Sequence, residues 1–363
     1  MRKKWSAGVK RIEECSQRYI WWFVVGTIIA FVLAGIMIFH FVQEKIVSSE
    51  EFELGNVALQ KAIEDSMDLK LSEDIVAQIT SIVLNDFPDL TDLSGIEQFE
   101  NLTSLTITNS GISDVSCLEN MIQLNTLDLS GNCIYDIKYL GGLTELEYLN
   151  LRNNRIFDLS PAFNLKKLRV LNAGENNLTS IDKLISELSY LQELVLDGNR
   201  LGNVNEIKNL PMLTILDLSK NKLKSFPELQ GLESLTMLYL NNNALSDISE
   251  LRGLPLLQKL NLSNNCLASM ENIKMYENLE ELVLSYNQIT DLKGIERLEQ
   301  LQSLDIRGNQ IFDVSILKSL SEFNTIYVDD NFDRTQLDFM VGNFRNADCL
   351  TKEYFLKLKY NLE

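Results

Sequence analysis

Histidine and cysteine, the side chains that most often carry nucleophilic or metal chemistry, are poorly placed for either in this sequence. His40 is the only histidine among the 363 residues, and it lies inside a long apolar stretch. The rest of the chain therefore offers no Ser–His or Cys–His nucleophile pair and no histidine ligand for a metal. The cysteines are too widely spaced for a zinc cluster or a disulfide-stapled module: Cys15, Cys117, Cys133, Cys266 and Cys349.

Other arrangements that would indicate catalysis are also missing from the sequence. No Gly-rich phosphate loop or EF-hand spacing is present. Paired carboxylates such as Asp329 and Asp330 are typical of a solvated turn, and a carbohydrate-cleaving pair would need a deep cleft around it. We therefore expect a non-catalytic protein with no metal site and no cofactor.

Asparagine, in contrast, recurs with a regular spacing. The pattern L-x-x-L-x-L-x-x-N-x-[LI] repeats every 22 residues, with a single spacing of 23, over residues 79–332. The asparagines of the pattern are Asn132, Asn154, Asn176, Asn199, Asn221, Asn243, Asn265, Asn287, Asn309 and Asn331, and Ser110 takes this position in the first full row. Because their period matches that of the leucines, we predict a buried structural ladder that satisfies backbone groups at the bend after each strand.

The leucines determine which elements hold this ladder. Positions four and six of each row point to the same side of an extended strand and must be buried. A single row cannot bury them, so the rows must stack with their strands in parallel. The pattern therefore predicts an α/β solenoid with a curved, concave parallel β-sheet.

An open solenoid exposes its core at both ends, and helical caps are predicted there. Residues 56–78 form the predicted N-terminal cap, in which Leu59, Ala62, Ile63 and Met67 share one helix face. Residues 333–363 form the predicted C-terminal cap, with helices that begin at Thr335 and Thr351.

The N-terminal region has the composition of a membrane anchor. Residues 20–42 contain no formal charge, and a helix of this length reaches about 34 Å, enough to span a bilayer. Residues 1–19 are basic, so we expect them to be cytoplasmic, with the repeats outside the cytoplasmic membrane after a linker at residues 43–55. A cleaved signal peptide is the alternative, but the apolar stretch is long and lacks a clear cleavage site. Gly26, Ala30 and Ala34 form a row of small residues through which two such helices would pack as a homodimer.

The charge of the chain is divided unequally. The net charge is −18, and residues 1–45 carry seven Lys or Arg against three acidic residues, or +4, so the remainder carries −18 − 4 = −22. Such an acidic body repels nucleic acid, which we exclude as a partner.

The segment FELGNVALQKAIEDS and the rows that end NCIYDI, NRIFDL, NQITDL and NQIFDV resemble the internalin-like leucine-rich-repeat proteins of bacteria over residues 52–332. The resemblance implies a horseshoe with short 3₁₀ helices on its convex side and an exported, ligand-binding solenoid.

The predicted binding surface lies on the exposed faces of the strands, at positions three and five of the central rows. We expect six apolar or aromatic residues to adjoin one another there: Tyr148, Val170, Val195, Ile215, Met237 and Tyr239. Exposed contiguous apolar surface usually marks a protein partner. The alternative is that β-branched and aromatic residues simply favour strands.

We therefore predict a membrane-anchored protein that binds a protein partner at the cell envelope through this concave face. Two alternatives remain open. The solenoid would act as a structural spacer or assembly component of a membrane complex, or its aromatic residues would form a carbohydrate-binding surface.

Overall fold

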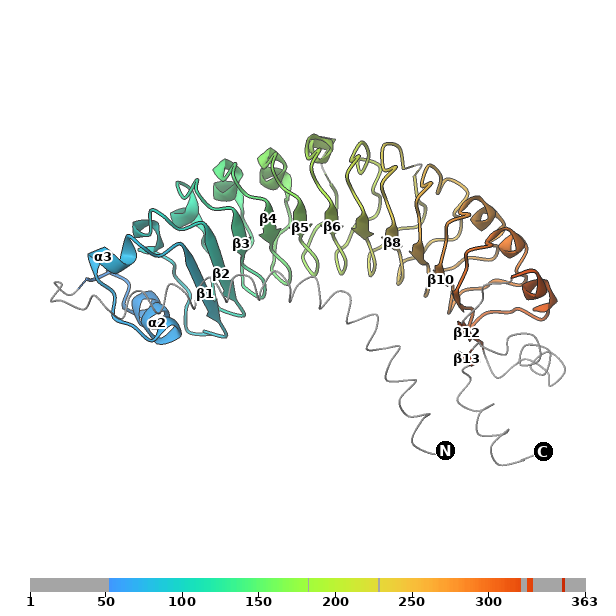
Figure 1. Ribbon diagram of the computed structural model, residues 1–363, viewed down its shortest axis with the longest axis horizontal. Helices are drawn as coiled ribbons and strands as arrows, with labels where there is room; N and C mark the ends of the chain where they lie inside the picture. The colour runs from blue at the N-terminus through green and yellow to red at the C-terminus, as the bar shows by residue number, and fades with distance from the viewer. Residues whose placement is uncertain (1–51, 182, 228, 321–324, 329–347, 350–363) are drawn as a thin grey trace, which may run out of the picture.

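The chain forms a curved solenoid in which every row adds one strand to a single sheet (Figure 1). This computed structural model describes residues 52–181, 183–227, 229–320, 325–328 and 348–349. The described strands are all parallel and pair in the order in which they occur along the chain. They are β1 (Ser81–Asn85), β2 (Ser104–Thr108), β3 (Thr126–Asp128), β4 (Tyr148–Asn150), β5 (Val170–Asn172), β6 (Glu193–Val195), β7 (Ile215–Asp217), β8 (Met237–Tyr239), β9 (Lys259–Asn261), β10 (Glu281–Val283), β11 (Ser303–Asp305), β12 (Thr325–Tyr327) and β13 (Asp348–Cys349).

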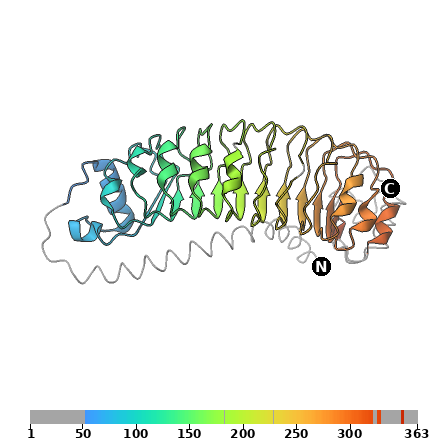
Figure 2. The same ribbon diagram turned by 90° about the horizontal axis from the view of Figure 1, so that it is seen from above.

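The register of the sheet follows the sequence repeat. Leu127 pairs with Leu149 and Leu149 with Leu171, one repeat apart in each case, and all three are fully buried. Across the row of 23 residues, Leu171 pairs with Leu194, so the strands remain aligned and the additional residue is accommodated outside them. Figure 2 shows the resulting strands side by side along the length of the molecule. The predicted parallel solenoid is confirmed.

The convex side carries short 3₁₀ helices, which Figure 1 shows on the outer side of the arch. They are η2 (Ile96–Gln98), η3 (Ser116–Leu118), η4 (Lys138–Gly142), η5 (Ser160–Asn164), η6 (Lys183–Glu187), η7 (Glu271–Met275), η8 (Ile295–Arg297) and η9 (Ser315–Ser319). An aspartate precedes several of them: Asp136 Oδ1 accepts a hydrogen bond from the Lys138 N–H at 2.9 Å, and Asp158 Oδ1 accepts one from the Ser160 N–H at 2.9 Å. This turn, in which a side chain replaces a backbone acceptor, explains the aspartate of the N-x-[IL]-x-D motif.

The asparagine ladder links each row to the row before it. Asn176 is 6% exposed, and its Oδ1 accepts the Ile156 N–H of the preceding row at 2.9 Å. Its Nδ2 donates to the Leu151 carbonyl of the preceding row at 2.9 Å and to the Ala173 carbonyl of its own row at 3.2 Å. The nine ladder asparagines from Asn132 to Asn309 repeat this arrangement. The side chain thus replaces strand-type hydrogen bonding where the backbone bends.

Two helices precede the first strand of the sheet. α2 (Val57–Met67) begins where the Asn56 side chain accepts the Leu59 N–H, and α3 (Glu73–Val76) begins where the Ser72 hydroxyl accepts the Ile75 N–H. Leu59 and Ile63 are fully buried and belong to the same apolar cluster as the leucines of the rows. α2 contacts β1, so its apolar face covers the first row of the solenoid.

Several predicted segments fall outside the described residues. They are the basic tail at residues 1–19, the membrane span at 20–42, residues 43–51 of the linker, Asn331, and the two helices predicted within 333–363. Within 333–363 the structure describes the two-residue strand β13, which was not predicted and which pairs in parallel with β12. No helix in the described portion of the chain has the length and apolar character needed to cross a bilayer.

Candidate functional site

The concave face is formed by the outward residues of the short strands. In β4 the sequence Tyr148–Leu149–Asn150 alternates half-buried, buried and half-buried, and the same alternation recurs in each strand from β5 to β10. Leucine at the middle position turns into the core, so the residues on either side of it face the concave surface. All six predicted binding residues occupy such half-buried positions.

The register shows how these six residues lie relative to one another. Tyr148 pairs with Val170, and Ile215 pairs with Met237, so the sheet contains two apolar pairs. The Tyr239 hydroxyl lies 3.7 Å from the sulfur of Met237. These pairs are not adjacent, however, because the residue between Val170 and Ile215 is a glutamate.

Two carboxylates interrupt the predicted apolar band. Glu193 pairs with Val170 on one side and with Ile215 on the other. Val195 lies between Asn172 and Asp217 and touches the rest of the band only as a diagonal neighbour. The expectation that the six residues adjoin in one continuous band is therefore corrected: they form a zigzag into which Glu193 and Asp217 are set. We call this surface, comprising the six residues with Glu193 and Asp217, the central concave patch.

Most polar residues at position five have a structural role that the sequence interpretation missed. Asn150 Oδ1 accepts the Arg152 N–H at 3.1 Å, Asn172 Oδ1 accepts the Gly174 N–H at 3.0 Å, and Asp217 Oδ1 accepts the Ser219 N–H at 2.9 Å. These side chains hold the backbone as it leaves the strand, so they are not wholly free to bind a partner. The frequency of Asn and Asp at this position was the available indication.

Val195 and Tyr239 depart from this rule, as Val283 does outside the patch. A valine side chain has no acceptor, and the oxygen of a tyrosine is too far along the ring to reach the N–H two residues later. Both rows lack this stabilising turn and instead present an apolar or aromatic group to the concave surface.

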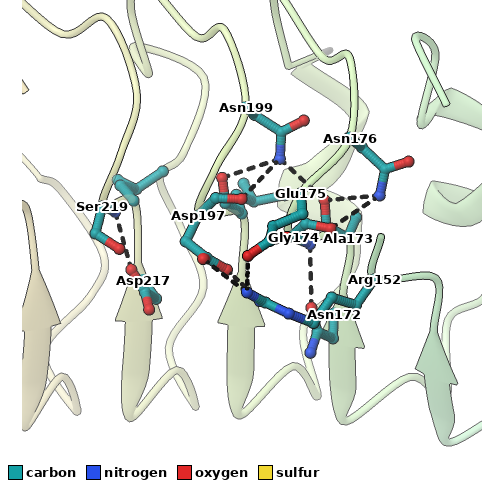
Figure 3. Close-up of polar contacts among 12 residues, drawn as sticks. Arg152, Asn172, Ala173, Gly174, Glu175, Asn176, Asp197, Asn199, Asp217 and Ser219 are labelled. Carbon is teal, nitrogen blue, oxygen red and sulfur yellow. Dashed lines mark hydrogen bonds and ion pairs between the residues drawn. The ribbon is translucent and has the colours of Figure 1, made fainter. Parts of the chain in front are cut away.

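The most extensive charge network on the concave face is centred on Arg152 (Figure 3). Its Nη1 lies 2.5 Å from Asp197 Oδ1, and its Nη2 donates to Asp197 Oδ2 at 3.0 Å and to Glu175 Oε1 at 2.7 Å. Arg152 and Asp197 occupy position seven of rows two repeats apart, so the arginine must pass over the row between them.

The row that Arg152 crosses has Gly174 at position seven. A Cβ at this residue would lie closer than 3.0 Å to both Asp197 Oδ1 and Arg152 Nη1. The glycine thus leaves open the space through which the arginine pairs with Asp197.

The other basic residues of the strand faces are also engaged by acidic neighbours. Arg169 Nε lies 2.9 Å from Glu147 Oε2, and Lys259 Nζ lies 3.0 Å from Glu281 Oε2. At the far end of the sheet, Arg307 Nη2 lies 2.6 Å from Asp305 Oδ2.

The two carboxylates of the central concave patch have no such cation. Among the residues that the structure describes, no ion pair reaches Glu193 or Asp217, and no hydrogen bond reaches the Glu193 carboxylate. Burial raises the pKa of Glu193, and the neighbouring Asp217 raises it further. Burial likewise raises the pKa of Asp217, although its hydrogen bonds to Ser219 oppose the shift.

The two tyrosines of the patch lie within the field of these carboxylates. Burial raises the pKa of Tyr148, and Asp128 and Glu193 add to the shift. Burial also raises the pKa of Tyr239 to about 12, with contributions from Glu281, Asp217 and Glu193. Both hydroxyls are therefore protonated at neutral pH and can donate a hydrogen bond.

The described residues contain no group of three or more His, Cys, Asp or Glu side chains that could hold a metal ion. Glu193 is not among the six predicted binding residues. Its place between Val170 and Ile215 follows from the repeat spacing, which was the signal available. The surface combines apolar and aromatic side chains with two unpaired carboxylates.

Comparisons with known proteins identify the class of this repeat. Sequence models described as leucine-rich repeats match residues 100–156, 211–253, 233–275 and 277–331. No curated protein sequence matches the chain. The matched rows and the parallel solenoid show that the chain is a leucine-rich-repeat protein.

Solved structures identify its structural relatives more closely. An internalin from Listeria monocytogenes is 25% identical, with a TM-score of 0.65 over 82% of this chain and 96% of its own. The functional domain of InlJ from the same organism, which includes a cysteine ladder, is 21% identical, with a TM-score of 0.65 over 78% of this chain and 63% of its own. The ectodomain of the Arabidopsis thaliana receptor kinase GASSHO1/SCHENGEN3, solved in complex with CASPARIAN STRIP INTEGRITY FACTOR 2, is 21% identical, with a TM-score of 0.56 over 77% of this chain and 42% of its own. The chain is thus a leucine-rich-repeat protein with structural similarity to Listeria internalins.

Proposed function

We propose that this protein binds a protein partner at the cell envelope through the central concave patch. The observation that carries the proposal is the group of half-buried apolar and aromatic side chains on β4 to β8, at positions where the packing of the repeat does not require them. Val195 and Tyr239 replace residues that elsewhere hold the backbone turn. Leucine-rich-repeat domains commonly mediate protein–protein binding, and the plant receptor ectodomain named above is solved with its protein ligand.

Many apolar residues of the convex side are committed to the core. Its apolar residues, such as Leu140, Leu143 and Leu229, are fully buried in the core. The ladder asparagines are committed to backbone groups at the turns. The strand faces of β4 to β8 offer apolar side chains in consecutive rows, although exposed apolar side chains also lie outside the strands, among them Tyr135, Phe157 and Phe312.

The membrane part of the proposal rests on the sequence. An apolar segment at residues 20–42 preceded by a basic tail supports a single-pass anchor with a cytoplasmic N-terminus and extracytoplasmic repeats. In a cysteine-free variant, one cysteine placed at Lys61 should react with a membrane-impermeant thiol reagent on intact cells. Reaction only after permeabilisation would reverse the proposed orientation.

The binding test uses a photo-crosslinking residue on the concave face of the full chain in its native membranes. Placed at Met237, it should capture a discrete partner, whereas the same residue at Met275 on the convex side should not. Tyr239→Ala or Ile215→Ala should weaken binding of that partner by about 1–4 kcal/mol, while Ser303→Ala should change it little. Normal binding by both central variants, together with loss of binding after convex substitutions, would place the site elsewhere. Unchanged association by every variant would favour a structural spacer.

A further inference from the structure

The central concave patch contains two carboxylates that form no ion pair with any residue that the structure describes. Glu193 sits in register between Val170 and Ile215, and Asp217 lies on the neighbouring strand beside Val195. A carboxylate in partly apolar surroundings is normally paired, because removing its charge from water is costly. Among the described residues no ion pair reaches either carboxylate, and the charge of Arg152 acts on Asp217 without forming an ion pair with it.

The nearby cations are already committed to other carboxylates. Arg152 is held by Asp197 and Glu175, Arg169 by Glu147, and Lys259 by Glu281. Gly174 directs Arg152 toward Asp197 by leaving the space between the two open. None of these described cations is therefore available to pair with Glu193.

The surroundings of Glu193 limit the chemistry of what can bind there. A neutral apolar ligand that covered the patch would bury Glu193 and Asp217 unpaired, at a cost in free energy, and an acidic ligand would be repelled. A cationic side chain avoids both costs. Tyr148 and Tyr239 each lie two strands from Glu193, about 10 Å at the backbone, so their rings flank the approach to it and can interact with a cation.

We propose that the partner presents a lysine or arginine side chain, flanked by apolar residues, whose cationic end binds Glu193 between Tyr148 and Tyr239. This inference rests on the proposed function, since it specifies the partner of the same surface. The net charge of −22 on residues 46–363 agrees with it, because an acidic body increases the rate at which a basic segment arrives. Asp217 provides a second carboxylate for an additional basic group on the same segment.

The test uses random heptapeptides displayed on phage and selected against the full chain in detergent micelles. The enriched peptides should contain Lys or Arg together with aromatic or aliphatic residues. The tightest one is then synthesised with its basic residue intact, replaced by Gln, and replaced by Glu. Replacement by Gln should weaken binding to the wild-type protein by at least about tenfold, and replacement by Glu by more.

Variants of the protein separate this inference from the function on which it rests. Glu193→Gln should abolish the preference for the basic peptide over its Gln form, while Glu277→Gln, the same change at an exposed glutamate after η7, should leave it intact. Binding of the basic peptide to wild type should also weaken as the pH falls through the raised pKa of Glu193, because the protonated acid no longer attracts a cation.

The outcomes are distinguishable. If the selected peptides lose binding with Tyr239→Ala and Ile215→Ala but are neutral or acidic and insensitive to Glu193→Gln, the concave site stands and the basic partner is wrong. If no peptide is enriched, or if binding is insensitive to all three substitutions, the proposed binding function itself is contradicted.

Discussion

Replacing Gly174 by alanine should destabilise the middle of the solenoid although the change adds a single methyl group. The methyl carbon would lie closer than 3.0 Å to Asp197 Oδ1 and to Arg152 Nη1. Both contacts are the ends of side chains, so we expect the ion pair to separate before the backbone moves. The loss in free energy of unfolding on Gly174→Ala then equals the loss from leaving Asp197 without its arginine.

The burial of Asp197 and Arg152 determines how much the free energy of unfolding falls when their ion pair breaks. The side chain of Asp197 is 7% exposed, whereas that of Arg152 is 33% exposed. Breaking a fully buried ion pair costs about 3–5 kcal/mol, and a fully exposed pair contributes only about 0–1 kcal/mol. Because one partner is buried and the other is partly solvated, we expect Gly174→Ala to lower the free energy of unfolding by about 1–3 kcal/mol.

The chain offers a matched control in Gly202, where an added Cβ would meet nothing within 4 Å. Gly202→Ala should therefore be neutral or stabilise by up to about 1 kcal/mol, since alanine restricts the unfolded chain. Both variants are compared by urea unfolding, followed by circular dichroism. Amide hydrogen exchange should show that the protection lost in Gly174→Ala is concentrated in β4 to β6, because solenoid rows interact mainly with their neighbours.

A double substitution isolates the cause. When Arg152→Gln and Asp197→Asn remove both charges, the pair no longer exists, and adding Gly174→Ala should cost much less than it does in the wild type. An equal cost in both backgrounds would refute the reasoning, because steric strain of the backbone would then account for the effect. A wild-type cost indistinguishable from that of Gly202→Ala would refute it as well.

Three further predictions concern the ladder, the patch and the turns. Asn176→Ala should lower stability by about 1–3 kcal/mol in urea unfolding, because the Ile156 N–H and three carbonyl groups lose their partner in a buried turn; a neutral effect would show that the ladder is dispensable there. Glu193→Gln should raise the melting temperature at neutral pH: the folded-state pKa of Glu193 is raised, so its contribution to stability is fully present below the unfolded-state pKa and is lost as the pH rises through the folded-state value. The difference between the two proteins should therefore shrink on acidification to below pH 4.5, and a difference that is independent of pH would contradict this account. Lys220→Gly should stabilise the chain by about 0.5–1 kcal/mol, because Lys220 has φ +53°, in the left-handed region that favours glycine; reduced stability would mean that the lysine side chain makes contacts that outweigh this strain.

Residues with a left-handed backbone conformation show how strongly the repeat restricts the residue type at one position. Position eight of each row follows the strand and has positive φ in every row from Asn109 to Gly308. Gly and Asn occupy most of these positions, as the backbone favours, but Glu175, Lys220 and Tyr286 do not. A row tolerates such exceptions because its neighbours hold it in place on both sides.

The sequence alone determined the architecture of the repeats. The 22-residue period of leucine and asparagine implies a stack of identical rows, because no single row can bury its leucines. From the period it follows that Leu127, Leu149 and Leu171 pair in register and that asparagines such as Asn176 occupy the turns. These inferences succeed because they depend on contacts between adjacent rows, which a strict repeat fixes in advance.

The tertiary structure decided what the concave face presents. Arg152 passes over one row to reach Asp197, and whether it does so depends on the curvature of the sheet and on the space left by Gly174, neither of which the repeat pattern encodes. The same is true of Glu193, whose significance lies in its having no ion pair with any described residue once Arg152 is paired with Asp197 and Glu175. Side-chain pairing on an open sheet depends on distances between rows and on competition among charges. A pattern of residue types therefore located the surface, but only the folded chain revealed which of its charges remain unneutralised.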